Sequence, residues 1–337
     1  MLKIAFVSSN PHPTTFRSEG SYIYRCENLA LGLAAMGHQV SHRHLNSLVA
    51  GRLAFDVAVF LRPTDSLRLR WVARRLKQAG CRMVADFDDL LYDPSFARFR
   101  PSVWSGQASL PRTTRKFVRH GNALRQFDRF TFSTQSLFDH FAALHPERLR
   151  LIVPNAAFRP WRELHRIHAE PRRITYFSGT RTHDRDFALV EPALTRLLEE
   201  RDDFRVQLVG PLQTRLDHRH VERVERVDFK RYADLVRSAH LNLAPLEDTP
   251  FNRCKSALKA IEAGCFGVPT IASPIGDYLR VATEGVLYAG EADQWYEQLR
   301  LALDESHYRR LSEGLIERLR PLSDVDRFAR EFLSFVA

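Results

Sequence analysis

The sequence lacks the features that mark several classes of protein. Its 337 residues include four cysteines, and no two of them form a C-x-x-C pair, so a disulfide scaffold is excluded and a reducing cytoplasm is expected. Fifteen glycines and 17 prolines are too few for a collagen-like or low-complexity chain. No apolar run approaches the roughly 18 residues of a membrane-spanning helix. The opening residues MLKIAFVSSN predict a buried strand and not a signal peptide.

Positive charge is in excess. Fifty Lys and Arg residues against 40 Asp and Glu give a formal charge of +10, which predicts an anionic partner. Nucleic acid, phosphorylated metabolites and an acidic membrane face all fit this charge. A nucleic-acid-binding protein is disfavoured, because the chain has no recognised binding motif, no interleaved aromatic platform and no basic tail.

Strand-like and helix-like segments alternate along the chain, and this pattern occurs twice. Repeated strand–helix units predict parallel sheets with right-handed crossovers. We therefore expect an α/β protein with two Rossmann-like, doubly wound domains that face each other across a cleft. The expected divisions are an N-terminal domain over 1–155, a hinge over 156–172, a C-terminal domain over 173–322 and a closing helix over 323–337.

The segment that carries most of the chemistry is NLAPLEDTPFNRCKSALKAIEAGCFGVPTIASPIGDY, residues 242–278. We expect a helix to begin between Asn252 and Lys255, where free backbone N–H groups attract phosphate. Asn252, Lys255 and Ser256 would add side-chain donors for a diphosphate. Glu262 follows two turns later and could accept hydrogen bonds from a ribose diol. A local cap or salt bridge is the alternative role for Glu262.

The run KSALKAIEAGCFGVPTIASPIGDY resembles the nucleotide-sugar signature of retaining glycosyltransferases with two Rossmann domains (the GT-B type), in particular family 4. The resemblance implies that Glu262 holds the donor ribose and that Ser273 to Gly276 lie near the donor. The common motif has two glutamates, and Cys254 stands at the first position. The PFNRCKS arrangement is similar to a subgroup found in bacterial surface-polysaccharide clusters.

A second segment, ITYFSGTRTHDRDFALV, predicts a strand, a turn and then a helix that starts near Asp186, which is the outline of a phosphate site. Its turn consists of Ser178, Gly179 and Thr180. By the resemblance, Arg181 together with Lys255 would neutralise the leaving diphosphate in place of a metal ion, and Arg185 is the alternative to Arg181. His183 and Asp184 could line the same cleft.

A third segment, RMVADFDDLLYDP, places several carboxylates where a strand should end. In the preferred interpretation, Asp88 and Asp89 orient or activate an acceptor hydroxyl. Alternatively, Asp86 and Asp88 form a metal-binding D-x-D motif, or the two act as nucleophile and general acid of a phosphatase. A fourth role is structural, with the carboxylates capping a helix that starts at Leu90.

Weaker signals lie elsewhere. Gly20 would allow close backbone approach to a donor phosphate, while Arg17 and Arg25 could reach an anionic ligand or lie solvated. The basic helix over 67–77 is either a solvated face or a surface for anionic lipid. The His-x-His pairs lack a third ligand, so no metal site is expected.

Together with these patterns, the resemblance implies a glycosyltransferase. It would move a sugar from a nucleotide-activated donor to a hydroxyl of a bacterial surface glycan, which we expect to be lipid-linked. Retention of configuration, independence of Mg²⁺ and the absence of a cofactor follow from the resemblance. We expect a cytoplasmic protein, peripheral at the inner membrane face, with no nucleic-acid partner. A nucleotide-sugar epimerase or hydrolase of similar fold is the alternative.

Overall fold

The computed structural model describes residues 1–51, 53–168, 171–179 and 181–337. The chain forms two compact units, which we describe separately. Unit 1 comprises Met1–Arg159, Cys254–Ser256 and Asp324–Ala337, and unit 2 comprises Pro160–Arg253 and Ala257–Ser323. The short segment 254–256 therefore belongs to unit 1, whereas the sequence pattern assigns it to the C-terminal domain.

Unit 1 contains a six-stranded sheet with the order β2-β1-β3-β4-β5-β6, and each neighbouring pair is parallel. Its strands are β1 (Lys3–Ser8), β2 (Gln39–His44), β3 (Val57–Leu61), β4 (Arg82–Phe87), β5 (Arg129–Phe132) and β6 (Leu149–Ile152). Its α-helices are α1 (Gly20–Tyr22), α2 (Asn28–Ala35), α3 (Ser47–Ala50), α4 (Leu67–Gln78), α5 (Pro101–Trp104), α6 (Leu110–Ala123), α7 (Gln135–Leu144) and α15 (Val325–Val336).

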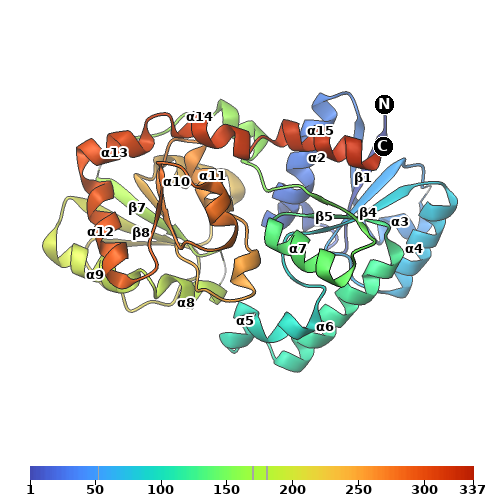
Figure 1. Ribbon diagram of the computed structural model, residues 1–337, viewed down its shortest axis with the longest axis horizontal. Coiled ribbons are helices and arrows are strands. Elements are labelled where there is room, and N and C mark those ends of the chain that lie inside the picture. The colour runs from blue at the N-terminus through green and yellow to red at the C-terminus, as the bar shows by residue number, and fades with distance from the viewer. Residues whose placement is uncertain (52, 169–170, 180) are drawn as a thin grey trace. The chain divides into compact units, whose positions relative to one another are not determined.

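Unit 2 repeats this architecture with the strand order β12-β11-β10-β7-β8-β9, again parallel throughout. Its strands are β7 (Arg172–Phe177), β8 (Phe204–Val209), β9 (Val221–Val224), β10 (Leu241–Ala244), β11 (Thr270–Ala272) and β12 (Val286–Tyr288). Its α-helices are α8 (Asp184–Phe187), α9 (Glu191–Glu200), α10 (Phe229–Ser238), α11 (Leu258–Gly264), α12 (Ala292–Leu303), α13 (Glu305–Ser312) and α14 (Leu315–Leu319). The sequence predicts two Rossmann-like α/β units, and the two sheets confirm them (Figure 1).

Local chemistry explains where the helices of unit 1 begin and end. The Ser66 hydroxyl accepts a hydrogen bond from the Leu69 backbone N–H at 3.1 Å and so caps α4. Gly37 and Gly80, with φ of +84° and +73°, follow the ends of α2 and α4. Glycine adopts this left-handed conformation without the steric cost that a Cβ brings, so both positions are suited to end a helix.

The last helix of the chain completes the core of unit 1. Figure 1 shows α15, in red, beside α2, in blue, and the two helices pack closely. Phe328 and Phe332 of α15 are buried in the same cluster as Ile4 of β1 and Leu29 of α2. A Cβ on Gly32 would lie 3.2 Å from that of Ala329, so glycine permits the close approach of the helices.

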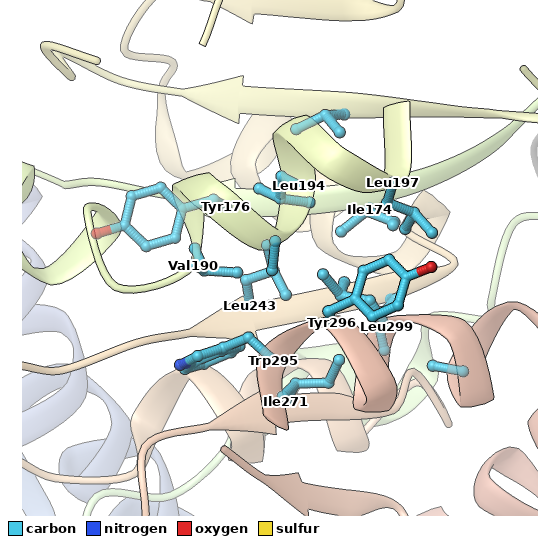
Figure 2. Packing of buried hydrophobic residues seen from close by; sticks show 14 of the residues in the cluster. Ile174, Tyr176, Val190, Leu194, Leu197, Leu243, Ile271, Trp295, Tyr296 and Leu299 are labelled. Atoms are coloured by element: carbon cyan, nitrogen blue, oxygen red, sulfur yellow. The ribbon is translucent and has the colours of Figure 1, made fainter. Parts of the chain in front are cut away.

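The core of unit 2 lies between its sheet and the helices α9 and α12. Figure 2 shows Leu194 and Leu197 of α9 pointing toward Trp295 and Leu299 of α12, with strand residues such as Leu243 among them. Burial of a large apolar side chain contributes about 1.5–3 kcal/mol, so this cluster is a main source of stability for unit 2. The packed core fixes the strand ends from which the polar loops emerge.

Candidate functional site

The strand order of unit 2 reverses between β7 and β10, which are neighbours in the sheet. Open parallel sheets bind ligands beyond the carboxyl ends of their strands at such a switch point. The loops after β7, β10 and β11 begin side by side there. They carry Ser178, Gly179 and His183, then Asn252, then Ser273, all of which the sequence predicts to contact a donor. The fold therefore brings these predicted residues to one edge of the sheet.

Asp186 organises this edge, and the sequence pattern does not identify it as a site residue. It is buried, and its Oδ1 accepts hydrogen bonds from the Glu247 backbone N–H at 2.8 Å and from the Asn252 side-chain amide at 3.1 Å. Its Oδ2 lies 2.8 Å from Nδ1 of His183. One carboxylate thus joins the loop after β7 to the loop after β10.

Two buried polar atoms at the same edge have no hydrogen-bond partner in the described part of the chain. They are Oδ1 of Asn252 and Oγ of Ser178, in residues that are 3% and 1% exposed. Buried oxygen atoms are almost always hydrogen-bonded in folded proteins, so such atoms at a loop edge indicate a place for a ligand or water. The Asn252 amide nitrogen is already used, since it also donates to the Glu247 carbonyl at 3.0 Å.

Glycines with positive φ follow the ends of β7 and β8. Gly179 has φ of +68° and Gly210, after β8, has φ of +96°. A Cβ at Gly210 would lie 2.8 Å from Oγ of Ser178, so a larger residue would displace that hydroxyl. Thr180 and the side chain of Arg181 lie outside the described residues, so the roles predicted for them stay predictions.

Glu262 lies on α11 and is 3% exposed. The Tyr232 hydroxyl donates a hydrogen bond of 2.7 Å to its Oε2. Burial, and then the Glu262 charge, raise the pKa of Tyr232 well above its ordinary value. A carboxylate has about four acceptor positions, so the bond from Tyr232 is compatible with further donors.

The start of α11 differs from the expectation. The helix begins at Leu258, not between Asn252 and Lys255, and Asn252–Cys254 form a short 3₁₀ turn. The Asp277 carboxylate accepts a hydrogen bond from the Ala257 backbone N–H at 2.9 Å, directly before the helix. This partner is distant in sequence, which explains why the local pattern misplaces the start. Lys255 therefore does not lie on the helix of Glu262.

Two other predicted residues of unit 2 have partners within the protein. The Ser273 hydroxyl accepts a hydrogen bond from the Leu246 backbone N–H at 2.9 Å and so holds the loop after β10. The Arg185 guanidinium pairs with Glu247 at 2.5 Å. Gly276 has φ of +54°, and a Cβ there would lie 2.4 Å from the Arg253 carbonyl, so that turn requires glycine.

In unit 1, Asp86 is a structural residue at the end of β4. Both of its oxygens accept hydrogen bonds from the buried Arg25 guanidinium, at 2.5 and 2.9 Å, and the Thr131 hydroxyl donates another at 2.6 Å. Arg25 is therefore not solvated at the surface, and its guanidinium is held by Asp86 instead of extending to an external anion. No group of three metal-binding side chains occurs among the residues that the structure describes.

Asp88 and Asp89 share a cationic partner. The Arg62 guanidinium donates to Asp88 at 2.5 Å and to Asp89 at 2.9 Å, and the Lys255 ammonium lies 2.7 Å from Asp89. Burial raises the pKa of Asp89, but Lys255 and Arg62 outweigh burial and lower it to about 2. No helix starts at Leu90, so the helix-cap role is wrong; Asp93 instead caps a 3₁₀ turn at Pro94–Phe99.

Polar contacts hold the segment 254–256 in unit 1, among them two hydrogen bonds and an ion pair. The Thr134 hydroxyl donates to the Cys254 carbonyl at 3.1 Å, and the Asn155 amide donates to the Ser256 hydroxyl at 2.9 Å. The third contact is the ion pair of Lys255 with Asp89. Two residues predicted for the donor site, Lys255 and Ser256, thus group with the acidic pair of unit 1.

The loop after β1 and the helix that follows it contain Arg17 and Gly20, two residues that the sequence predicts near an anionic ligand. Gly20 begins α1, and a Cβ there would meet no atom within 4 Å, so packing does not require glycine. Arg17 pairs with Glu27 at 2.5 Å and 3.0 Å. The predicted role of Gly20 near a donor phosphate remains a prediction.

No family model matches the sequence, and no curated protein is significantly similar to it. The structure nevertheless resembles solved structures over nearly its whole length. A sucrose-phosphate synthase from Thermosynechococcus elongatus has a TM-score of 0.69 at 15% identity, with 99% of this chain and 98% of that chain covered. A glycosyltransferase from Rickettsia africae has a TM-score of 0.67 at 11% identity, with coverage of 99% and 97%.

A third similar structure is HepE of Anabaena in complex with UDP and glucose. Its TM-score is 0.63 at 13% identity, and 99% of each chain is covered. At these identities the likeness establishes the fold. The chain has the GT-B fold of two Rossmann-like units.

Proposed function

We propose that the protein is a glycosyltransferase whose unit 2 binds a nucleotide-activated sugar. The observation that carries the proposal is the switch-point edge of unit 2, where Asp186 joins two loops. Beside it lie oxygens of Asn252 and Ser178 that have no hydrogen-bond partner among the described residues. Solved proteins of the same fold that bind UDP or UDP-glucose support it. Glu262 would accept hydrogen bonds from the donor ribose.

The donor diphosphate needs positive charge as it leaves. We propose Arg181, or alternatively Arg185, together with Lys255 for this role, because fixed cations stabilise charge that develops on a leaving group. These side chains would replace a divalent metal. The resemblance of the 255–278 segment to glycosyltransferase family 4 supports retention of the anomeric configuration.

We propose that Asp88 and Asp89 of unit 1 bind and orient the acceptor hydroxyl. Asp89 stays ionised at neutral pH, since its pKa lies at about 2, and an ionised carboxylate can accept a hydrogen bond from a hydroxyl and orient it. The resemblance of the PFNRCKS run to the surface-polysaccharide subgroup supports a glycan acceptor carried by a lipid. Mutation of Asp88 or Asp89 should therefore slow transfer more than it weakens donor binding.

A lipid-linked acceptor would bring the protein to a membrane surface. No described helix is long and apolar enough to span a membrane. The exposed face of α4 instead combines Leu67 and Trp71, which are 81% and 44% exposed, with several arginines. Such a mixture of apolar and basic residues suits the interface of an anionic bilayer, so we propose a peripheral position at the cytoplasmic face.

A donor screen tests the function. The purified protein is heated with UDP-, GDP-, ADP- and dTDP-sugars, and the matching donor should raise the melting temperature, because it binds the folded state alone. Release of nucleoside diphosphate is then measured with and without lipid-linked glycan. Acceptor-dependent release supports transfer, whereas release or isomerisation that ignores the acceptor would identify a hydrolase or epimerase. No shift with any donor would contradict the proposal.

A further inference from the structure

Arg62 has an unusual backbone conformation. It lies at the switch point of unit 1, where the strand order reverses between β1 and β3. It follows β3 directly and has φ of +45°, the one positive value of a non-glycine residue in the described chain. Its backbone N–H donates to the Asp86 carbonyl at 2.8 Å, and its guanidinium bridges Asp88 and Asp89. Strained conformations of this kind persist where surrounding contacts impose them, and they cluster at functional sites.

Helix α6 is docked on the loop that Arg62 begins. Nδ1 of His120 lies 2.8 Å from the Pro63 carbonyl, and the Asp65 backbone N–H donates to the Arg119 carbonyl at 3.0 Å. Lys116 lies one turn before His120 and thus on the same face of α6. The 3₁₀ turn Pro94–Phe99 packs against α6, and Arg100 follows it directly.

Positive charge at this place exceeds negative charge, since four cations (Arg62, Arg100, Lys116 and Lys255) act against three carboxylates (Glu19, Asp88 and Asp89). Arg62 and Lys255 pair with Asp88 and Asp89. Arg100 and Lys116 make no ion pair with any residue that the structure describes.

The electrostatics of these two cations agree with that surplus. Desolvation lowers the pKa of Lys116, and the charges of Arg100 and Arg62 lower it further, against an opposite effect of Glu19. Desolvation and Arg62 lower the pKa of Arg100, against an opposite effect of Asp89. The positive charges therefore lie close enough to repel one another. A bound anion would reduce this repulsion.

We propose that Arg62, Arg100 and Lys116 bind a phosphate-class oxyanion carried by the acceptor. We name these three residues the cationic cluster. Guanidinium groups match the oxygen geometry of phosphate. Asp88 and Asp89 accept from Nε and Nη2 of Arg62 and hold the side chain in place, so Nη1 is the group that would bind the anion. This proposal rests on the proposed function in one respect, namely that unit 1 binds the acceptor. Phosphate of a sugar phosphate and phosphate of a lipid headgroup share this chemistry.

The test compares Arg100→Gln, Lys116→Gln and the double variant with wild type. Arg115→Gln is the matched control, because Arg115 lies next to Lys116 on the same helix, about 100° further round the axis, and is not among the charges that act on Lys116. Glucose 6-phosphate and glucose are titrated by calorimetry. Vesicles of phosphatidylglycerol and of phosphatidylcholine are tested by sedimentation. The variants should melt no lower than wild type, since each removes a repelled charge.

Glucose 6-phosphate, or the anionic vesicle, should bind wild type and the control, and the double variant should lose at least tenfold in affinity. If the double variant loses affinity for glucose 6-phosphate, the phosphate belongs to a soluble sugar phosphate. If it loses affinity for the anionic vesicle alone, the phosphate belongs to a lipid headgroup. Equal affinity of wild type and double variant for both probes, or binding of neither, would overturn the site. A nucleotide-sugar titration runs in parallel. Phosphate binding without any nucleotide-sugar binding would refute the proposed function and leave the oxyanion site standing.

Discussion

The ammonium group of Lys255 lies 2.7 Å from the carboxylate of Asp89, two residues that are 166 positions apart in sequence. The pair joins the segment 254–256 to the acidic end of β4 within unit 1. Asp89 also accepts a hydrogen bond from the Arg62 guanidinium, so the three side chains form a network of charges that stabilise one another.

Replacement of Lys255 by Met should destabilise unit 1 at neutral pH by about 2 kcal/mol, because the pKa of Asp89 now lies at about 2, below its ordinary 3.8. A carboxylate with a lowered pKa contributes stability above its ordinary pKa and loses it as the pH falls through the folded value. The defect should therefore shrink between pH 4 and pH 2.

Urea unfolding at pH 7, 4 and 3 measures this effect. Lys77→Met is the control, since Lys77 and Asp128 form an exposed ion pair at 3.6 Å. Exposed pairs contribute about 0–1 kcal/mol, so the control should change little. An equal effect of both substitutions would mean that the Lys255 pair is no stronger than a surface contact.

Replacement of Asp186 by Asn should disconnect the loops after β7 and β10. Oδ1 and Oδ2 accept from three groups, and an amide nitrogen in place of one oxygen would face a donor. A buried donor left unsatisfied costs about 1–3 kcal/mol. We expect that loss in unfolding free energy and at least a tenfold weaker binding of the donor found by the screen.

Asp217→Asn serves as the control for Asp186, because Asp217 is exposed. Calorimetric titration of the donor and urea unfolding give the two readouts. Unchanged donor affinity in the Asp186 variant would show that the loops do not depend on this carboxylate.

Acid should destabilise the protein through buried histidines. Burial lowers the pKa of His120 to about 4, so the unfolded chain takes up a proton below its ordinary pKa of 6.5 while the folded chain does not. Stability is therefore lost as the pH falls from 6.5 toward 4. His120 alone should remove about 2 kcal/mol between pH 7 and pH 5.

A His120→Asn variant should unfold with a shallower pH dependence over that interval, as followed by urea titration. The amide that this substitution introduces can still donate to the Pro63 carbonyl, which is the contact of Nδ1 in the native side chain. His12→Asn is a suitable control, since His12 is exposed. A slope equal to that of wild type would show that His120 does not titrate in this way.

Contact with an anionic membrane should depend on the exposed face of α4. Trp71→Ser together with Leu67→Ser removes apolar surface that is exposed in the folded protein, so stability should change by less than about 0.5 kcal/mol. Sedimentation with phosphatidylglycerol vesicles should fall several-fold. Ser replacements of Leu144 and Leu149, which are 48% and 55% exposed elsewhere in unit 1, are the control. Equal vesicle binding by both double variants would exclude α4 as the contact.

Most of the architecture could be predicted from short-range patterns. Continuous apolar runs such as 57–61 are typical of parallel strands covered on both faces, and glycines such as Gly37 and Gly80 are a local signal for the end of a helix. The short strands β9 and β12 gave no such signal, because their residues are mixed in polarity or only three in number.

The site was predictable only where its chemistry is local. Glu262 and Asn252 stand out by motif and spacing, whereas Asp186 gains its role from loops about 60 residues away. The positive φ of Arg62 arises from contacts of the fold, and no local residue preference predicts it. Arg25 is typical of a surface cation in sequence, but its partner Asp86 is 61 positions away.

The most direct test of the central claim is calorimetric titration of the nucleotide sugar selected by the screen into three proteins. These are wild type, Glu262→Ala and the exposed control Glu199→Ala on α9. The account predicts saturable binding to wild type and to the control, and at least tenfold weaker binding to Glu262→Ala. Equal affinity in all three proteins, or no nucleotide sugar bound by wild type, would contradict it.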